Sequence, residues 1–100
     1  MLNLNKTRTD DSLTVTMEGR LDTTTAPQLE SALKESLEGV TALTMDLEKL
    51  EYISSAGLRV LLSAQKTMNK QGEMKIIHAG EAIMEIFEVT GFSDILTIEQ

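Results

Sequence analysis

The fold is decided by residues 46–70, which read Asp46-Leu-Glu-Lys-Leu-Glu-Tyr-Ile-Ser-Ser-Ala-Gly-Leu-Arg-Val-Leu-Leu-Ser-Ala-Gln-Lys-Thr-Met-Asn-Lys70. Apolar residues alternate with polar ones over 43–47, which predicts the end of a buried strand followed by a short acidic loop. From Ala56 onward, apolar residues recur at helical spacing until Gly72, a residue type that commonly ends a helix. The segment is therefore predicted to be strand, loop, turn and amphipathic helix.

The turn contains Ser54, Ser55, Ala56 and Gly57 and lies at the N-terminus of the predicted helix. A helix N-terminus presents unpaired N–H groups and a partial positive charge, so it accommodates a serine oxygen or a phosphate group. With Ala56 as the first helical residue, Ser55 is the better placed N-cap. The residues alone leave two interpretations open: an ordinary N-cap, which is the commoner role of serine there, and a modified hydroxyl.

The first part of the chain is predicted to form an antiparallel hairpin. Residues 2–8 and 13–17 alternate between apolar and polar types, and residues 9–12 carry a turn signal. Asp10 and Asp11 fall in this turn, where solvation explains them better than a metal or acid–base site does.

A second turn-and-helix unit follows the hairpin. Gly19-Arg20-Leu21-Asp22 leads out of the second strand, and Thr25 and Gln28 have the spacing of a capping box. Pro27 suits the first turn of the predicted helix, whose apolar face ends before Gly39.

The last third continues the alternation of strands and helices. A short apolar strand over 74–77 ends at His78, a helix runs between Gly80 and Gly91, and residues 95–98 are a further strand candidate. A hairpin followed by alternating helices and strands is typical of an α/β fold with a mixed sheet of four to five strands and βαβ crossovers. Residues 1–100 are predicted to be one domain.

Composition excludes several classes of function. The net charge of −7 makes direct nucleic-acid binding and attraction to anionic membranes improbable. There is no cysteine, so thiol chemistry is excluded. No apolar run approaches the roughly 18 residues of a membrane span, so no membrane insertion and a cytoplasmic location are expected.

An enzyme is not expected. Serine catalysis needs a base and an orienting acid, and His78 is the single histidine. As a strand-end residue, His78 is better explained by a satisfied side chain than by a catalytic role. No glycine-rich phosphate loop is present, and no metal or cofactor is expected.

Two segments carry a resemblance to a known family. Residues 53–62, Ile-Ser-Ser-Ala-Gly-Leu-Arg-Val-Leu-Leu, follow a strand that ends in Asp-Leu, and Gly19-Arg20-Leu21-Asp22 lies upstream at a suitable spacing. Together they resemble STAS domains, and more narrowly the bacterial anti-sigma factor antagonists, also called anti-anti-sigma factors. The resemblance spans the whole chain and implies a single STAS domain over 1–100.

The resemblance also implies a site. The family's phosphorylated serine is two residues before the glycine, which is Ser55 here. Ser54 stands where the family often has Asp, which leaves two hydroxyls, Ser54 and Ser55, as alternatives for the acceptor. Ala56 stands where the family often has Ser or Thr, which removes one competing acceptor. The surface implied to meet the partner consists of Asp22, Thr23, Thr24, Ser54, Ser55, Ala56, Gly57, Leu58 and Arg59.

The function implied by the resemblance is a protein switch. The unmodified form is expected to bind an anti-sigma factor, which in this family is often an ATP-using serine kinase, and to release its sigma factor. Phosphorylation of Ser55 would end that binding, and a serine phosphatase would restore it. The chain is expected to be a monomer or a weak dimer. The alternatives are a STAS adaptor subunit, on a transporter ATPase or in a signalling assembly without a phosphoswitch, and a small-ligand sensor, for which no pocket signature is found.

Overall fold

The computed structural model describes residues 2–99, which form a five-stranded sheet with helices between its strands. In chain order the elements are β1 (Leu2–Thr9), β2 (Ser12–Leu21), α1 (Ala26–Ser36), β3 (Ala42–Ile53), α2 (Ser55–Gln71), β4 (Glu73–Ile77), α3 (Glu81–Thr90), a 3-10 helix η1 (Phe92–Asp94) and β5 (Ile98–Glu99). Within this range, no helix is both long and apolar enough to cross a membrane.

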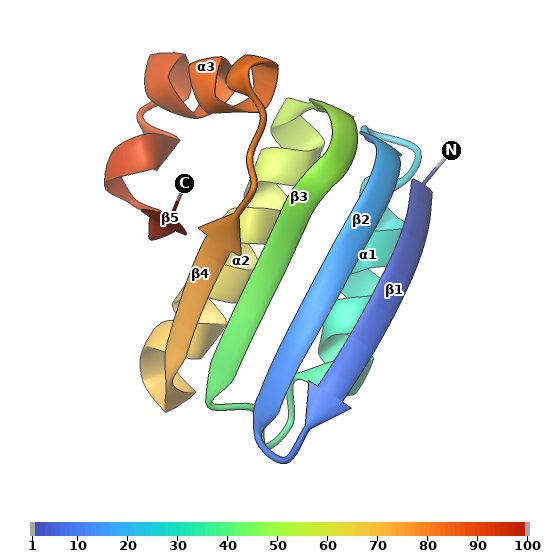
Figure 1. Ribbon diagram of the computed structural model, residues 1–100, viewed down its shortest axis with the longest axis vertical. Helices are drawn as coiled ribbons and strands as arrows, with labels where there is room; N and C mark the ends of the chain where they lie inside the picture. The colour runs from blue at the N-terminus through green and yellow to red at the C-terminus, as the bar shows by residue number, and fades with distance from the viewer. Residues whose placement is uncertain (1, 100) are drawn as a thin grey trace.

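The sheet is mixed, as predicted. Its strands lie in the order β1-β2-β3-β4-β5, with β1 antiparallel to β2 and the other neighbouring pairs parallel. Each parallel pair is joined through a helix, so the predicted βαβ crossovers are confirmed. Helices α1 and α2 cover one face of the sheet, while α3 lies beyond the end of β4 (Figure 1).

Most of the core lies between the sheet and the helices α1 and α2, and α3 adds the buried Ile83 and Phe87. Strand residues that alternate along β2 and β3 are buried on this face, and the helices contribute leucine and methionine side chains from their inner faces. The buried strand residues are Leu13, Val15, Met17, Leu43, Met45 and Leu47, and the helix residues include Leu29, Leu33, Leu61 and Met68. The intervening residues of the same strands are polar and only partly buried, for example Thr14, Thr16 and Thr44, and strand alternation directs them to the opposite face of the sheet.

The predicted acidic loop after the third strand is wrong. Strand β3 continues to Ile53, and its last residues pair with the end of β2, Lys49 with Glu18 and Ile53 with Leu21. The register shifts along this stretch, with one more residue in β3 than in β2 between the Asp46 and Lys49 pairings. A bulge of this kind breaks the alternation of apolar and polar residues, which is why the sequence pattern indicated a loop.

The predicted capping box at the start of α1 is also wrong. Thr25 is the N-cap, but its side chain makes no capping hydrogen bond. Its hydroxyl donates instead to the carbonyl oxygen of Arg20 at 2.9 Å, and Gln28 donates from Nε2 to the carbonyl oxygen of Leu2 at 3.0 Å. Both side chains are therefore used to attach the turn and the helix to the sheet.

The predicted last strand is much shorter than the pattern indicated. Gly91, with a φ of 80°, ends α3, and η1 follows directly. The N–H groups of Ile95 and Leu96 both donate to the carbonyl oxygen of Phe92, so this backbone is turned rather than extended. Within residues 2–99, the last strand consists of Ile98 and Glu99, which pair with Ile76 and Ile77 of β4.

Candidate functional site

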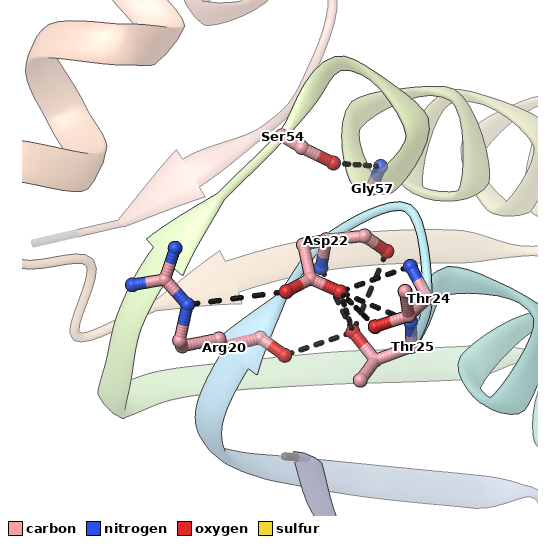
Figure 2. A network of polar contacts seen from close by, with 6 residues as sticks. All are labelled: Arg20, Asp22, Thr24, Thr25, Ser54 and Gly57. Carbon is pink, nitrogen blue, oxygen red and sulfur yellow. Dashed lines mark hydrogen bonds and ion pairs between the residues drawn. The ribbon is translucent and has the colours of Figure 1, made fainter.

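Two turns meet where β2 and β3 end. Leu21 and Ile53 are paired in the sheet, and the N–H of Ser54 donates to the carbonyl oxygen of Leu21 at 2.9 Å. The turn between β2 and α1, residues 22–25, therefore lies beside residues 54–57, which are the N-cap and the first turn of α2 (Figure 2). We call these the 22–25 turn and the 54–57 turn.

Asp22 organises the 22–25 turn. Its Oδ1 accepts hydrogen bonds from the Thr24 hydroxyl at 2.7 Å, the Thr24 N–H at 3.0 Å and the Thr25 N–H at 3.1 Å. The Thr24 hydroxyl, aided by the N–H groups of Thr24 and Thr25, holds the pKa of the Asp22 carboxyl below its ordinary value, although desolvation opposes the shift. The turn is thus built around an ionised carboxylate, as Figure 2 shows.

The N-cap of α2 is Ser54, so the prediction that Ser55 has this role is wrong. Ser54 has extended backbone and its Oγ accepts the N–H of Gly57 at 3.3 Å. The helix begins one residue earlier than its apolar pattern indicated, because Ser55 itself is helical. Of the two serines, Ser54 has the structural role.

Ser55 does not cap the helix. It is the first residue of α2 and is exposed, and its hydroxyl makes no hydrogen bond within residues 2–99. It also lies at the helix end whose N–H groups and dipole favour negative charge.

Not every residue of the predicted partner surface is accessible. Leu58 is buried in the core, and Gly57 is buried against Leu21 and Ile53, where an added Cβ would come within 2.7 Å and 2.9 Å of side-chain carbons. These two residues hold the 54–57 turn on the sheet and offer no side chain to a partner.

Three of the accessible residues lie around a shallow hollow between α1 and α2. Thr23, Ala56 and Arg59 line this hollow of about 220 Å³ together with Pro27 and Glu30. Arg59 is exposed and forms no ion pair in the described part of the chain. The structure thus brings Thr23 of one turn together with the first residues of α2.

Sequence reasoning missed two residues at this edge. The Arg20 guanidinium lies over the Tyr52 ring, 4.4 Å from its centroid, and Arg20 Nε is 3.9 Å from Oδ2 of Asp22. Arg20 and Tyr52 are paired across β2 and β3. Their contact depends on this register, for which the sequence carried no signal.

The interpretation of His78 as a strand-end residue with a satisfied side chain is confirmed. His78 Nδ1 lies 3.1 Å from Asp46 Oδ1. In the described residues its partners are carboxylates, and none is a serine.

The chain matches a known family over nearly its full length. The model of the STAS domain matches residues 3–100. The anti-sigma-B factor antagonist of Listeria monocytogenes is 33% identical over 97 residues, covering 94% of this chain and 84% of that protein. The anti-sigma-B factor antagonist of Staphylococcus aureus is 30% identical over 101 residues, covering 99% and 94%.

Solved structures show the same fold. The anti-sigma factor antagonist from Mycobacterium paratuberculosis superposes with a TM-score of 0.89 at 24% identity, over 98% of this chain and 85% of that one. The unphosphorylated form of the anti-sigma factor antagonist SpoIIAA gives a TM-score of 0.76 at 16% identity, over all of this chain and 88% of that one. The sheet, the two turns and the matches over almost every residue lead to one conclusion: the chain belongs to the STAS domain family, among the anti-sigma factor antagonists.

Proposed function

We propose that the unmodified protein binds an anti-sigma factor that is also a serine kinase, and that phosphorylation of Ser55 ends this binding. The observation that carries the proposal is the exposed Ser55 hydroxyl at the start of α2, beside the 22–25 turn. The curated relatives are named as antagonists of an anti-sigma factor, which supports a regulatory binding protein.

The two serines divide their roles in a way that supports Ser55 as the acceptor. Ser54 is half-buried and its oxygen is bonded to the Gly57 N–H. Phosphorylation of Ser54 would disrupt the hydrogen bond that caps the helix, and such a cap contributes about 1 kcal/mol. Ser55 offers an exposed oxygen with no bond to lose within residues 2–99. One related structure is of SpoIIAA in its phosphorylated form, so this fold is compatible with the modification.

The phosphate acts as a local charge switch. Phosphorylation adds about −1.5 to −2 charges, which the N-terminus of α2 tolerates. In a close interface the same charge must be desolvated and repels carboxylates of the partner. Each tenfold loss of affinity requires only about 1.4 kcal/mol.

The partner is proposed to contact the exposed part of the two turns. This surface comprises Asp22, Thr23, Thr24, Ser54, Ser55, Ala56 and Arg59, with Gly57 and Leu58 as its buried support. A serine phosphatase is proposed to reverse the modification.

The test begins with co-purification of the protein's partners from its native cell. The captured kinase is then incubated with ATP and the wild-type protein, and the phosphate is mapped by mass spectrometry. We expect label on Ser55, no label on Ser55→Ala, and full label on Ser63→Ala, a control at an exposed serine further along α2. Ser55→Ala should still bind the kinase, and Ser55→Asp should bind at least about tenfold more weakly.

Two results would overturn the proposal. Label on Ser54 alone would show that the wrong hydroxyl was assigned. Capture of a transporter ATPase without any serine kinase, and without label on the protein, would indicate the adaptor role.

A further inference from the structure

Three side chains with metal-binding atoms converge where β4 ends beside β3 and the chain continues toward α3. Asp46 and Glu48 belong to β3, and His78 follows the end of β4. His78 Nδ1 lies 3.1 Å from Asp46 Oδ1 and 3.6 Å from Glu48 Oε1. One ligand atom from each residue lies within 4.8 Å of the other two.

The fold brings these residues together. Asp46 is paired with Ile77, so His78 follows directly beside it. Glu48 is two residues further along β3, where strand side chains return to the same face, and its N–H donates to Asp46 Oδ1 at 3.0 Å. His78 has a φ of 58°, a left-handed conformation that is uncommon outside glycine.

The distances from His78 Nδ1 to the two carboxylates are close to the ligand–ligand distances of a tetrahedral metal site. Zinc binds imidazole nitrogen and carboxylate oxygen at about 2.0–2.2 Å, so neighbouring ligand atoms of a tetrahedral site are about 3.3–3.6 Å apart. The two separations from Nδ1, 3.1 and 3.6 Å, lie at or close to this range. The third separation, between the two carboxylates, is at most 4.8 Å, and the Glu48 side chain that sets it is exposed.

The charge of the cluster favours a cation. Within residues 2–99, the carboxylates of Asp46 and Glu48 form no ion pair with a lysine or an arginine, and their one cationic partner is His78 when protonated. With a neutral imidazole, the two negative charges of the carboxylates are left uncompensated, and a bound metal ion would replace the proton that Nδ1 donates to Asp46 Oδ1. Acidic residues also outnumber basic ones over the whole chain, which has a net charge of −7.

We propose that Asp46, Glu48 and His78 form a binding site for Zn²⁺ or a similar divalent transition-metal ion. One nitrogen and two oxygens are ligands that zinc accepts, and three protein ligands leave a fourth position for water. An imidazole ligand selects against Mg²⁺ and Ca²⁺, which prefer oxygen. The ion would fasten the connection between β4 and α3 to β3. This inference does not depend on the proposed role of Ser55.

The test is a titration of the purified full chain with ZnCl₂ by calorimetry, followed by Co²⁺ as a spectroscopic probe. We expect one Zn²⁺ per chain with a Kd below about 1 mM, a higher Tm with Zn²⁺, and Co²⁺ absorption bands typical of a tetrahedral site. Two substitutions remove a ligand atom but preserve the local backbone. His78→Asn places at this position a residue type that tolerates positive φ, and Asp46→Asn keeps a side-chain oxygen that can accept the Glu48 N–H. Each should weaken Zn²⁺ binding at least about tenfold.

The control is Glu51→Gln, which removes an exposed carboxylate from the same strand without touching the three ligands. It should bind Zn²⁺ within twofold of the wild type. The proposal is overturned if the wild type shows no one-to-one binding, or if His78→Asn binds Zn²⁺ as tightly as the wild type. Equal affinity for Mg²⁺ and Zn²⁺ would also overturn it, because an exposed acidic cluster alone would then explain the binding. Circular dichroism of each metal-free variant checks that the fold is retained.

Discussion

The N–H of Ser54 donates to the carbonyl oxygen of Leu21 at 2.9 Å, so the last residue of β2 holds the N-cap of α2. This bond joins the 22–25 turn to the 54–57 turn through the backbone. The position of Ser55 therefore depends on the pairing of β2 with β3 as well as on its own helix.

The N-cap assignment is tested by Ser54→Ala. Loss of the oxygen leaves the Gly57 N–H without its cap, so we expect the free energy of unfolding to fall by about 1 kcal/mol. Ser54→Asp retains a capping oxygen and should remain close to the wild type. Urea denaturation measures both changes. Ser63→Ala, in the exposed middle of α2, should be neutral or slightly stabilising, and an equal loss there would contradict the assignment.

Close packing beneath the 54–57 turn is tested by Gly57→Ala. The new Cβ would come within 2.7 Å of Leu21 Cγ and 2.9 Å of Ile53 Cγ1, both in fully buried side chains. Overpacking costs about 1–3 kcal/mol, which exceeds the gain of at most about 1 kcal/mol from removing glycine from a helix. We therefore expect a net loss of stability in chemical denaturation.

A double-mutant cycle locates the cause of that loss. Leu21→Ala is itself destabilising by about 2–5 kcal/mol, but it opens the space that the new methyl group needs. Gly57→Ala should therefore cost less in the Leu21→Ala background than in the wild type. Additive effects of the two substitutions would show that the contact between these residues is not responsible.

The ionised state of Asp22 predicts a pH dependence. Because the pKa of this carboxyl is lower in the folded protein than its ordinary value, the group stabilises the fold above the ordinary value, and this contribution disappears as the pH falls through the folded-state pKa. Asp22→Asn lacks the contribution at every pH. The difference in unfolding free energy between wild type and Asp22→Asn should therefore be constant near neutral pH and shrink below about pH 4.

That comparison needs a carboxylate outside the turn as a control. Glu51→Gln changes an exposed group on β3, and its difference from the wild type should vary less over the same pH range. A difference for Asp22→Asn that stays constant down to about pH 2 would contradict the role assigned to the Thr24 and Thr25 hydrogen bonds.

Phosphorylation of Ser55 is expected to leave the domain folded. The phosphate lies at the favourable end of α2, and Arg59 is one helical turn further along. Hydrogen exchange should therefore show local changes near residues 54–59 only, and widespread loss of protection would mean that the switch works by unfolding. Arg59→Ala should destabilise the phosphorylated form by about 0.3–1 kcal/mol more than the unmodified form. Lys66→Ala, two turns further along α2, should show no such difference.

By itself, the sequence determined the elements whose signals are local. These signals depend only on neighbouring residues in the chain: the alternation along β2 and the start of β3, the apolar face of α2, and the glycine at position 72. They predicted the mixed α/β fold and a serine turn at a helix N-terminus. The two family segments were sufficient to indicate the family that the comparisons confirmed.

Only the tertiary structure decided which serine caps the helix, and which residues meet at the ends of the strands. Ser54 rather than Ser55 is the cap because its backbone is bonded to Leu21, more than thirty positions earlier in the chain. The Arg20–Tyr52 contact and the approach of His78 to Asp46 likewise arise from the register between neighbouring strands. Register is set by packing between distant segments, so a one-dimensional pattern does not contain it.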